Sequence, residues 1–191
     1  TITQLVDTAG KLSQNRRGAL IVVDLGSDLR PEDFLYSGTN IEAQLSTDLL
    51  INLFATDTPL HDGAVLVKGN KIISAGVILP LSRQGISRYG TRHLAALGIT
   101  ERFDRCICIV VSEETGTLSL ANQGKLERPI TSSRLQELLA NLIGNQNSMG
   151  GNKASLSKNV SSQKTGSSDN IISDINKKES EKSEIFINKQ D

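Results

Sequence analysis

The sequence predicts a single α/β domain. Two apolar runs, residues 18–23 and 106–111, are rich in Val and Ile and carry no charge, as is typical of strands buried on both faces of a sheet. Other segments repeat apolar residues at helical spacing, which predicts helices packed on that sheet. A chain of 191 residues can hold one ordinary domain and a tail. We expect the domain to occupy residues 1–143.

The elements of the first half follow from this periodicity. Apolar side chains recur from Ile2 to Leu12 with the period of a helix, and Ser46 has the residue type and position of a helix N-cap. The predicted elements are a helix over residues 2–14, a strand over 18–23, a turn cluster over 26–31, at best a short edge segment over 33–38, and a helix over 47–54.

The elements of the second half are predicted from the same kinds of pattern. The predicted elements are a hairpin of residues 65–67 and 72–79 with Gly69–Asn70 at its tip, a polar loop over 80–89, a helix that begins at Thr91, strands over 106–111 and 117–121 joined by the polar turn 112–116, a further turn over 122–124, and a last helix over 132–143. After Gly144 the composition is polar and without a sustained period. This predicts a disordered tail over residues 144–191. Its short apolar patches, 171–172 and 185–187, are either docking segments for a partner or apolar residues of the tail that bind nothing.

Composition excludes several classes of function. The formal net charge is zero and aromatic residues make up 3% of the chain, so we expect no nucleic-acid partner. Cys106 and Cys108 stand two apart in an apolar run, a spacing that strains a disulfide on a strand. Buried core thiols in a reducing compartment are therefore expected. No apolar run approaches the length of a membrane span.

A loop directly before a predicted strand carries a histidine beside a carboxylate. The stretch is Pro59-Leu60-His61-Asp62-Gly63-Ala64. Gly63 allows a backbone N–H to approach a ligand closely, and a polar pair at the mouth of a buried strand is where α/β folds tend to hold ligands. The alternative is a strand-initiating turn in which Asp62 accepts local hydrogen bonds.

Two further polar clusters stand at the ends of core elements, residues 91–93 and 112–114. The N-terminus of the helix that begins at Thr91 suits a phosphate, and Arg92 adds a permanent charge there. Acidic oxygens of Asp62, Glu113 and Glu114 suit Mg²⁺ or Mn²⁺, with His61 as a softer ligand. Together these groups favour phosphoryl or nucleotidyl transfer. The alternatives are a solvated first helical turn and an ordinary hairpin tip.

These motifs, in this order, resemble the diadenylate cyclase domain. The resemblance is carried by Asp62-Gly63-Ala64, by Gly90-Thr91-Arg92-His93 and by residues 112–116, with Leu60-His61 and residues 79–82 beside them. It covers roughly residues 1–143 and is closest to the membrane-anchored bacterial class. It implies a central mixed sheet surrounded by helices that condenses two ATP into cyclic di-AMP and two pyrophosphates. It also implies a divalent metal, Mg²⁺ or Mn²⁺.

The resemblance also assigns roles to single residues. Asp62 would position or deprotonate the attacking ribose 3′-hydroxyl, and Arg92 and His93 complete the catalytic set. The implied substrate-binding residues are Gly63, Ala64, Leu79, Thr91, Ser112 and Glu114, with the Leu79 backbone at the adenine edge. The implied metal ligands are His61 and Glu113, although the choice between Glu113 and Glu114 stays open.

One position departs from the family pattern. Leu94 stands where the family's Arg-His-Arg motif has its second arginine, so a phosphate-directed charge is missing. Arg83 and Arg88 are candidates to replace it. The alternative functions are a catalytically silent module that binds ATP or a cyclic dinucleotide, and a scaffold in which the motifs are structural.

The reaction and the family imply partners. Each chain has one set of clusters and holds one ATP, so a transient face-to-face homodimer is expected. The family's upstream transmembrane segment is absent, and the chain begins at Thr1. We therefore expect a cytoplasmic catalytic part of a longer protein, tethered to the cell membrane with this domain on the cytosolic side.

Overall fold

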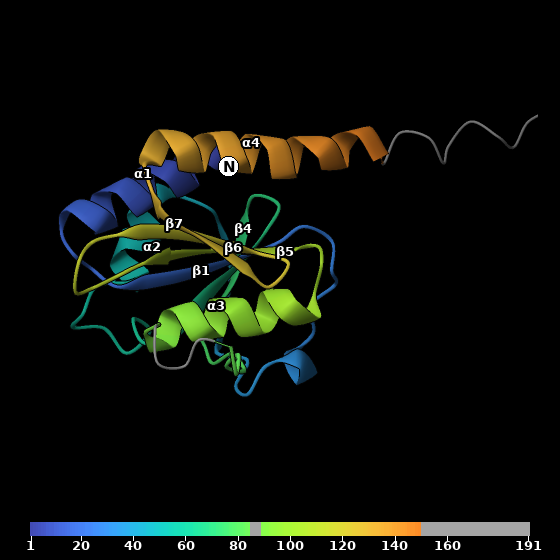
Figure 1. Cartoon of the computed structure of the whole chain (residues 1–191). Coiled ribbons are helices and arrows are strands. Elements are labelled where there is room, and N and C mark those ends of the chain that lie inside the picture. The colour runs from blue at the N-terminus through green and yellow to red at the C-terminus, as the bar shows by residue number, and fades with distance from the viewer. Residues whose placement is uncertain (85–88, 150–191) are drawn as a thin grey trace, which may run out of the picture. The chain divides into compact units, whose positions relative to one another are not determined.

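The computed structural model describes residues 1–84 and 89–149, and the statements below concern these residues. Seven strands form one mixed sheet with helices on both faces (Figure 1). The predicted α/β class with a central mixed sheet is thereby confirmed. Most of the predicted tail, its two apolar patches and Arg88 lie outside the described residues.

In the described part of the chain, helices are interspersed with single strands, a strand pair and a run of three strands. They are α1 (Ile2–Gln14), β1 (Ala19–Asp24), the 3-10 helix η1 (Pro31–Asp33), β2 (Thr39–Gln44), α2 (Thr47–Leu53), β3 (Ala64–Lys68), β4 (Lys71–Val77), α3 (Thr91–Arg102), β5 (Cys106–Val111), β6 (Leu118–Asn122), β7 (Lys125–Ile130) and α4 (Ser132–Met149). The Ser46 hydroxyl accepts a hydrogen bond from the Leu49 N–H at 3.2 Å. This confirms Ser46 as the N-cap of α2.

The two runs expected to be buried strands lie at the centre of the sheet. The strand order is β2-β4-β3-β1-β5-β6-β7, and every residue of β1 and β5 is buried. β1 and β3 are parallel, with Ile21 opposite Val65. All other neighbouring strands are antiparallel. The central strands are apolar on both faces because helices cover both faces.

Alternate residues of the central strands enter two separate cores. Ile21 and Val23 pack with residues of α1, α2 and α4, and Val22 packs with residues of α3 on the opposite face. Figure 1 shows α1, α2 and α4 together on one side of the sheet and α3 on the other. Cys106 and Cys108 are free thiols in the α3 core, as expected, and burial raises the pKa of the Cys108 thiol well above its ordinary value.

Two strands were not predicted, and both are edges of the sheet. β2 reads Thr-Asn-Ile-Glu-Ala-Gln and is largely exposed. β7 reads Lys-Leu-Glu-Arg-Pro-Ile and is exposed at four of its six positions. The residues 33–38 expected as an edge segment contribute one bridge, between Tyr36 and Ile78. α4 continues to Met149, past the predicted end at Ile143.

The three polar clusters come together at one end of the central strands. Gly18 precedes β1, Gly63 precedes β3, and Ser112 follows the antiparallel strand β5. The registers place Ala19 opposite Val111 and Ile21 opposite Val65, so these three chain ends are neighbours. The clusters therefore lie at the amino ends of the parallel pair β1 and β3. None of the helices in the described part of the chain is both long and apolar enough to cross a membrane.

Candidate active site

The N-terminus of α3 forms the floor of the site. Gly90 is the N-cap and supplies no side-chain hydrogen bond, while its carbonyl accepts from the N–H groups of His93 and Leu94 at 3.0 and 3.1 Å. The first N–H groups of a helix have no partner within the helix. Thr91 is exposed and Arg92 half-buried at this end, so the helix presents its partial positive charge to a ligand.

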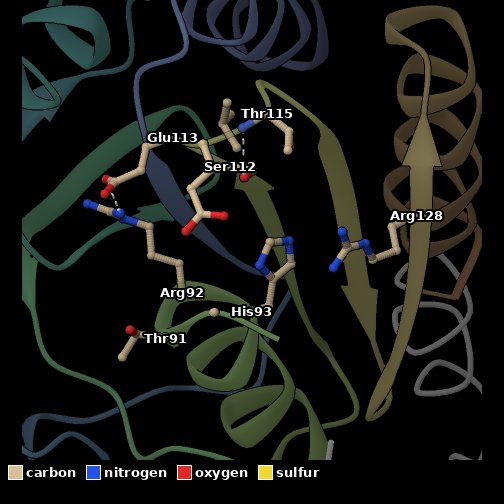
Figure 2. A pocket seen from close by; sticks show the side chains of 10 residues that line it. Thr91, Arg92, His93, Ser112, Glu113, Thr115 and Arg128 are labelled. Atoms are coloured by element: carbon tan, nitrogen blue, oxygen red, sulfur yellow. Dashed lines mark hydrogen bonds and ion pairs between the residues drawn. The ribbon is translucent and has the colours of Figure 1, made fainter. Parts of the chain in front are cut away.

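Arg92 is held by an ion pair. Its Nη1 donates to Oε2 of Glu113 at 2.6 Å, and the Arg92 side chain is 25% exposed. Figure 2 shows the two side chains meeting at one side of the pocket. The pair lies directly over Gly18, where an added Cβ would be 2.7 Å from both atoms of the contact. Gly18 is therefore the residue that makes room for this pair.

His93 is buried beside Arg92. Its Nε2 lies 3.2 Å from the Ser119 hydroxyl, and its ring stacks on Tyr89 with centroids 6.2 Å apart. Burial, and then the positive charge of Arg128, lower the pKa of the imidazole below its ordinary value. His93 is consequently a neutral group of fixed orientation near pH 7.

The turn between β5 and β6 brings the two glutamates to the site. The Gly116 N–H donates to the Ser112 carbonyl at 2.9 Å, and the Ser13 hydroxyl at the end of α1 donates to the Gly116 carbonyl at 2.5 Å. Gly116 has a φ of 73°, a conformation that favours glycine. The turn is thus anchored to α1, and the exposed side chains of Glu113 and Glu114 project from it.

These parts enclose a polar cavity of about 240 Å³. Its lining comes from the start of α3, the turn after β5, and one residue of β7: Gly90, Thr91, Arg92, His93, Val111, Ser112, Glu113, Glu114, Thr115 and Arg128. Arg128 was not predicted. Its guanidinium carbon lies 5.6 Å from the Tyr89 ring centroid, and Figure 2 shows it directed toward His93. The sequence predicted no element over residues 125–130, so nothing marked Arg128 as a site residue.

A second, more apolar cavity adjoins the first. Its lining is Leu20, Asp62, Gly63, Val77, Ile78, Leu79, Leu81, Thr91, Arg92 and Ala95. Thr91 and Arg92 line both cavities. The structure therefore brings Asp62, Gly63 and Leu79, all predicted site residues, next to the phosphate-directed end of α3. Asp62 is exposed and Leu79 is buried.

Gly63 also has a structural reason to be glycine. Its φ is 118°, and an added Cβ would be 2.7 Å from the Gly76 carbonyl carbon. This contact joins the start of β3 to β4, whose mutual register shifts here. Gly63 accordingly serves a close backbone approach between strands as well as lining the cavity.

Two predicted site residues line neither cavity. Ala64 is wholly buried in the α3 core. His61 is half-buried, and its Nδ1 lies 2.5 Å from the Thr58 carbonyl oxygen. Within residues 1–84 and 89–149, no group of three or more His, Cys, Asp or Glu is arranged to hold a metal ion. The ligand roles of His61 and Glu113 remain predictions.

Leu94 and Arg83, the one of its two candidate substitutes that the structure describes, also lie apart from the cavities. Leu94 is 7% exposed, and its carbonyl accepts the Ser82 N–H at 2.9 Å. Its side chain is thus part of the packed body of the domain. Arg83 is exposed and lines neither cavity.

The polar cavity has two arginines, two glutamates and a helix N-terminus, and it adjoins a more apolar cavity that carries a carboxylate. Such an arrangement suits a nucleotide-binding α/β domain. Its sequence identifies the family of nucleotide-binding domains to which the chain belongs. The family described as DisA bacterial checkpoint controller nucleotide-binding, the diadenylate cyclase domain, matches residues 6–126. The chain belongs to this family, and the predicted resemblance to the diadenylate cyclase domain is confirmed. The expected place in the membrane-anchored class stays a prediction.

Relatives and solved structures agree. A diadenylate cyclase of Listeria monocytogenes is 47% identical over 130 residues, which are 67% of this chain and 46% of that protein. The cyclic di-AMP synthase CdaA of Bacillus subtilis is 41% identical over 141 residues, 73% of this chain and 50% of that protein. A crystal structure of a double cysteine mutant of DacA from Staphylococcus aureus superimposes with a TM-score of 0.68 at 38% identity, covering 74% of this chain and 94% of that one. The chain spans about half the length of the curated relatives it matches.

Proposed function

We propose that this chain is the catalytic domain of a diadenylate cyclase, which condenses two ATP into cyclic di-AMP and two pyrophosphates. The observation that carries the proposal is the sharing of Thr91 and Arg92 by the two cavities. The polar cavity suits a triphosphate and the apolar cavity suits a nucleoside, so the α-phosphate falls at their junction. Relatives named as diadenylate cyclases support the same function.

The reaction at this junction is a nucleotidyl transfer. The ribose 3′-oxygen of one ATP attacks the α-phosphorus of the facing ATP, and the bond from that phosphorus to the β-phosphate oxygen breaks. The hydroxyl proton passes to the carboxylate of Asp62, which is exposed and lines the apolar cavity. Pyrophosphate leaves with the bonding electron pair. The same step, repeated in the opposite sense, closes the ring.

The polar cavity stabilises the phosphates. The α3 N-terminus and Arg92 supply positive charge, and the Arg92 Nε is buried without a partner in the described part of the structure. Because Glu113 already orients the guanidinium, its remaining N–H groups are available to a phosphate. His93, which is buried beside Arg92, lines the same cavity.

We further propose that Mg²⁺ or Mn²⁺ acts with the ATP. Glu113 and Glu114 line the polar cavity and offer hard oxygen ligands. The described residues do not form a complete protein cage, which fits an ion that takes its other ligands from substrate phosphates and water. When bound, the ion neutralises phosphate charge.

A face-to-face homodimer follows from the reaction. Ile78 and Leu81, which line the apolar cavity, are 41% and 50% exposed. Leu35 and Tyr36 are 71% and 58% exposed, and Tyr36 pairs with Ile78. This apolar rim beside Asp62 supports a contact with a second copy.

We propose that the domain works on the cytosolic side of a membrane, reached through an upstream segment of a longer protein.

Incubation of the chain with ATP and Mn²⁺ or Mg²⁺, followed by chromatography of the nucleotides, tests the function. We expect cyclic di-AMP and pyrophosphate. Bound ATP without product would favour the silent module that Leu94 suggested, and neither binding nor product would favour a scaffold. The buried position of Leu94 weakens the reason for the silent module, since its side chain is accommodated by packing.

A further inference from the structure

The polar cavity has a second arginine that the family motifs did not indicate. Arg128 comes from the edge strand β7 and lines the cavity together with Thr91, His93 and Glu114. It does not line the apolar cavity, whereas Thr91 and Arg92 line both. Asp62 therefore lies in the apolar cavity, the α3 N-terminus lies between the two cavities, and Arg128 lies in the polar cavity.

The two arginines of the cavity differ in their partners. The Arg92 guanidinium is paired with Glu113 at 2.6 Å. Arg128 forms no ion pair with any residue of the described part of the chain. Figure 2 shows Arg92 turned to Glu113 and Arg128 on the opposite side of the pocket. Arg128 is thus the cavity cation whose charge is left for a ligand.

The orientation of Arg128 suits an anion. Its guanidinium carbon is 5.6 Å from the Tyr89 ring centroid, within the range of a cation–π contact. A cation–π contact needs no hydrogen bond from the guanidinium, so its N–H groups can still bind phosphate oxygens in pairs. Tyr89 in turn stacks on His93, so Arg128 is connected to the α3 end of the site.

We propose that Arg128 binds the β- and γ-phosphates of ATP and supports the charge of the departing pyrophosphate. This inference rests on the proposed function. With the α-phosphate at the junction near Arg92 and Asp62, the chain of phosphates extends into the polar cavity, toward Arg128. Arg128 also supplies, from a different element, a second phosphate-directed cation that position 94 lacks.

The test compares Arg128→Ala, Arg128→Lys and the control Lys125→Ala. Lys125 lies on the same strand, and its removal takes away one positive charge outside the polar cavity. Steady-state KM and kcat for ATP are measured, together with calorimetric binding of inorganic tripolyphosphate and of AMP. We expect Arg128→Ala to lower kcat/KM and tripolyphosphate affinity by about tenfold to a hundredfold, as loss of a charge-assisted contact does. AMP affinity stays unchanged, and Arg128→Lys recovers part of the loss.

The outcomes separate this inference from the function on which it rests. If the wild-type chain forms cyclic di-AMP and Arg128→Ala matches Lys125→Ala in both kcat/KM and tripolyphosphate binding, Arg128 is not a phosphate ligand. An equal loss of AMP affinity would overturn the assignment to the β- and γ-phosphates. The wild-type chain could form no cyclic di-AMP while Arg128→Ala still lowers the affinity for tripolyphosphate. In that case the proposed function fails and the phosphate contact stands.

Discussion

Asp62 is the residue on which the proposed chemistry depends most directly. It is exposed in the loop before β3 and lines the apolar cavity next to Arg92. We predict that Asp62→Asn keeps the fold and the affinity for ATP but lowers formation of cyclic di-AMP by about a hundredfold or more, because the amide cannot accept the hydroxyl proton. Product formation is measured by chromatography and folding by circular dichroism.

Asp57→Asn is the matched control, since Asp57 is an exposed carboxylate in the same connection between α2 and β3. It lines neither cavity, and we expect full activity. Wild-type turnover by Asp62→Asn would remove Asp62 from the mechanism. Equal losses in the two variants would indicate a general effect of charge near the site.

At the level of elements, α3 positions both cavities through its contact with the preceding loop. The Ser82 N–H donates to the Leu94 carbonyl at 2.9 Å, and the Ser82 hydroxyl donates to Glu101 at 2.6 Å. Gly98 allows the loop to pass directly over the helix, because an added Cβ would overlap the Pro80 carbonyl oxygen. Leu79 and Leu81, which line the apolar cavity, are thereby fixed relative to Thr91.

This contact predicts the effect of Gly98→Ala. The added methyl group must displace the Pro80–Ser82 backbone, so we expect the free energy of unfolding to fall by about 1–3 kcal/mol, as for other overpacked sites. We also expect a higher KM for ATP because Leu79 moves with the loop. Urea unfolding and steady-state kinetics measure the two effects.

Gly10→Ala provides the comparison for a helical glycine without such a contact. Its added Cβ would lie 3.4 Å from the Ser132 hydroxyl, at the edge of ordinary contact, and alanine is the better helix former. We expect this variant to be as stable as the wild type or more so. A Gly98→Ala variant that unfolded at the same urea concentration and kept its KM would show that the loop adapts without cost.

The elements that the sequence predicted well are those whose pattern is set by burial. β1 and β5 are apolar on both faces, and α1 and α3 repeat with a helical period, so each was recognisable without its neighbours. β2 and β7 are edge strands whose side chains are mostly exposed. Their pairing depends on β4 and β6, and Pro129 argues against a strand in sequence. Local patterns do not carry that information.

The same reason explains what was found and missed at the site. Thr91, Arg92 and His93 were predicted because the start of α3 could be located, and a helix N-terminus has a direction. Arg128 lies on an unpredicted strand, and its approach to His93 depends on how β7 pairs at the far edge of the sheet. The pairing of Arg92 with Glu113 over Gly18 joins residues far apart in the sequence, and its geometry had no local signal.

At the scale of the whole molecule, the site opens at one end of the central strands with no second copy of itself in the described chain. Each chain has one Asp62, in the loop before β3, and one Arg92, in the first turn of α3. Cyclic di-AMP has two equivalent phosphodiester links, so the proposed function requires that two such sites face each other across a two-fold axis. The exposed apolar side chains Leu35, Tyr36, Ile78 and Leu81 are few, and a small contact of this kind favours a weak dimer.

We therefore predict that specific activity rises with protein concentration, because only the dimer contains facing nucleotides. Mixing Asp62→Asn with an excess of wild-type chain gives heterodimers with one competent carboxylate, which form one link and release the linear intermediate pppApA. Chromatography resolves this product from cyclic di-AMP, and light scattering follows the association. Asp57→Asn, mixed in the same ratio, should yield cyclic product only. Constant activity per molecule over about a hundredfold dilution, with a monomer throughout, would contradict the facing arrangement. Complete cyclic product from the Asp62→Asn mixture in proportion to all chains present would show instead that one carboxylate serves both links.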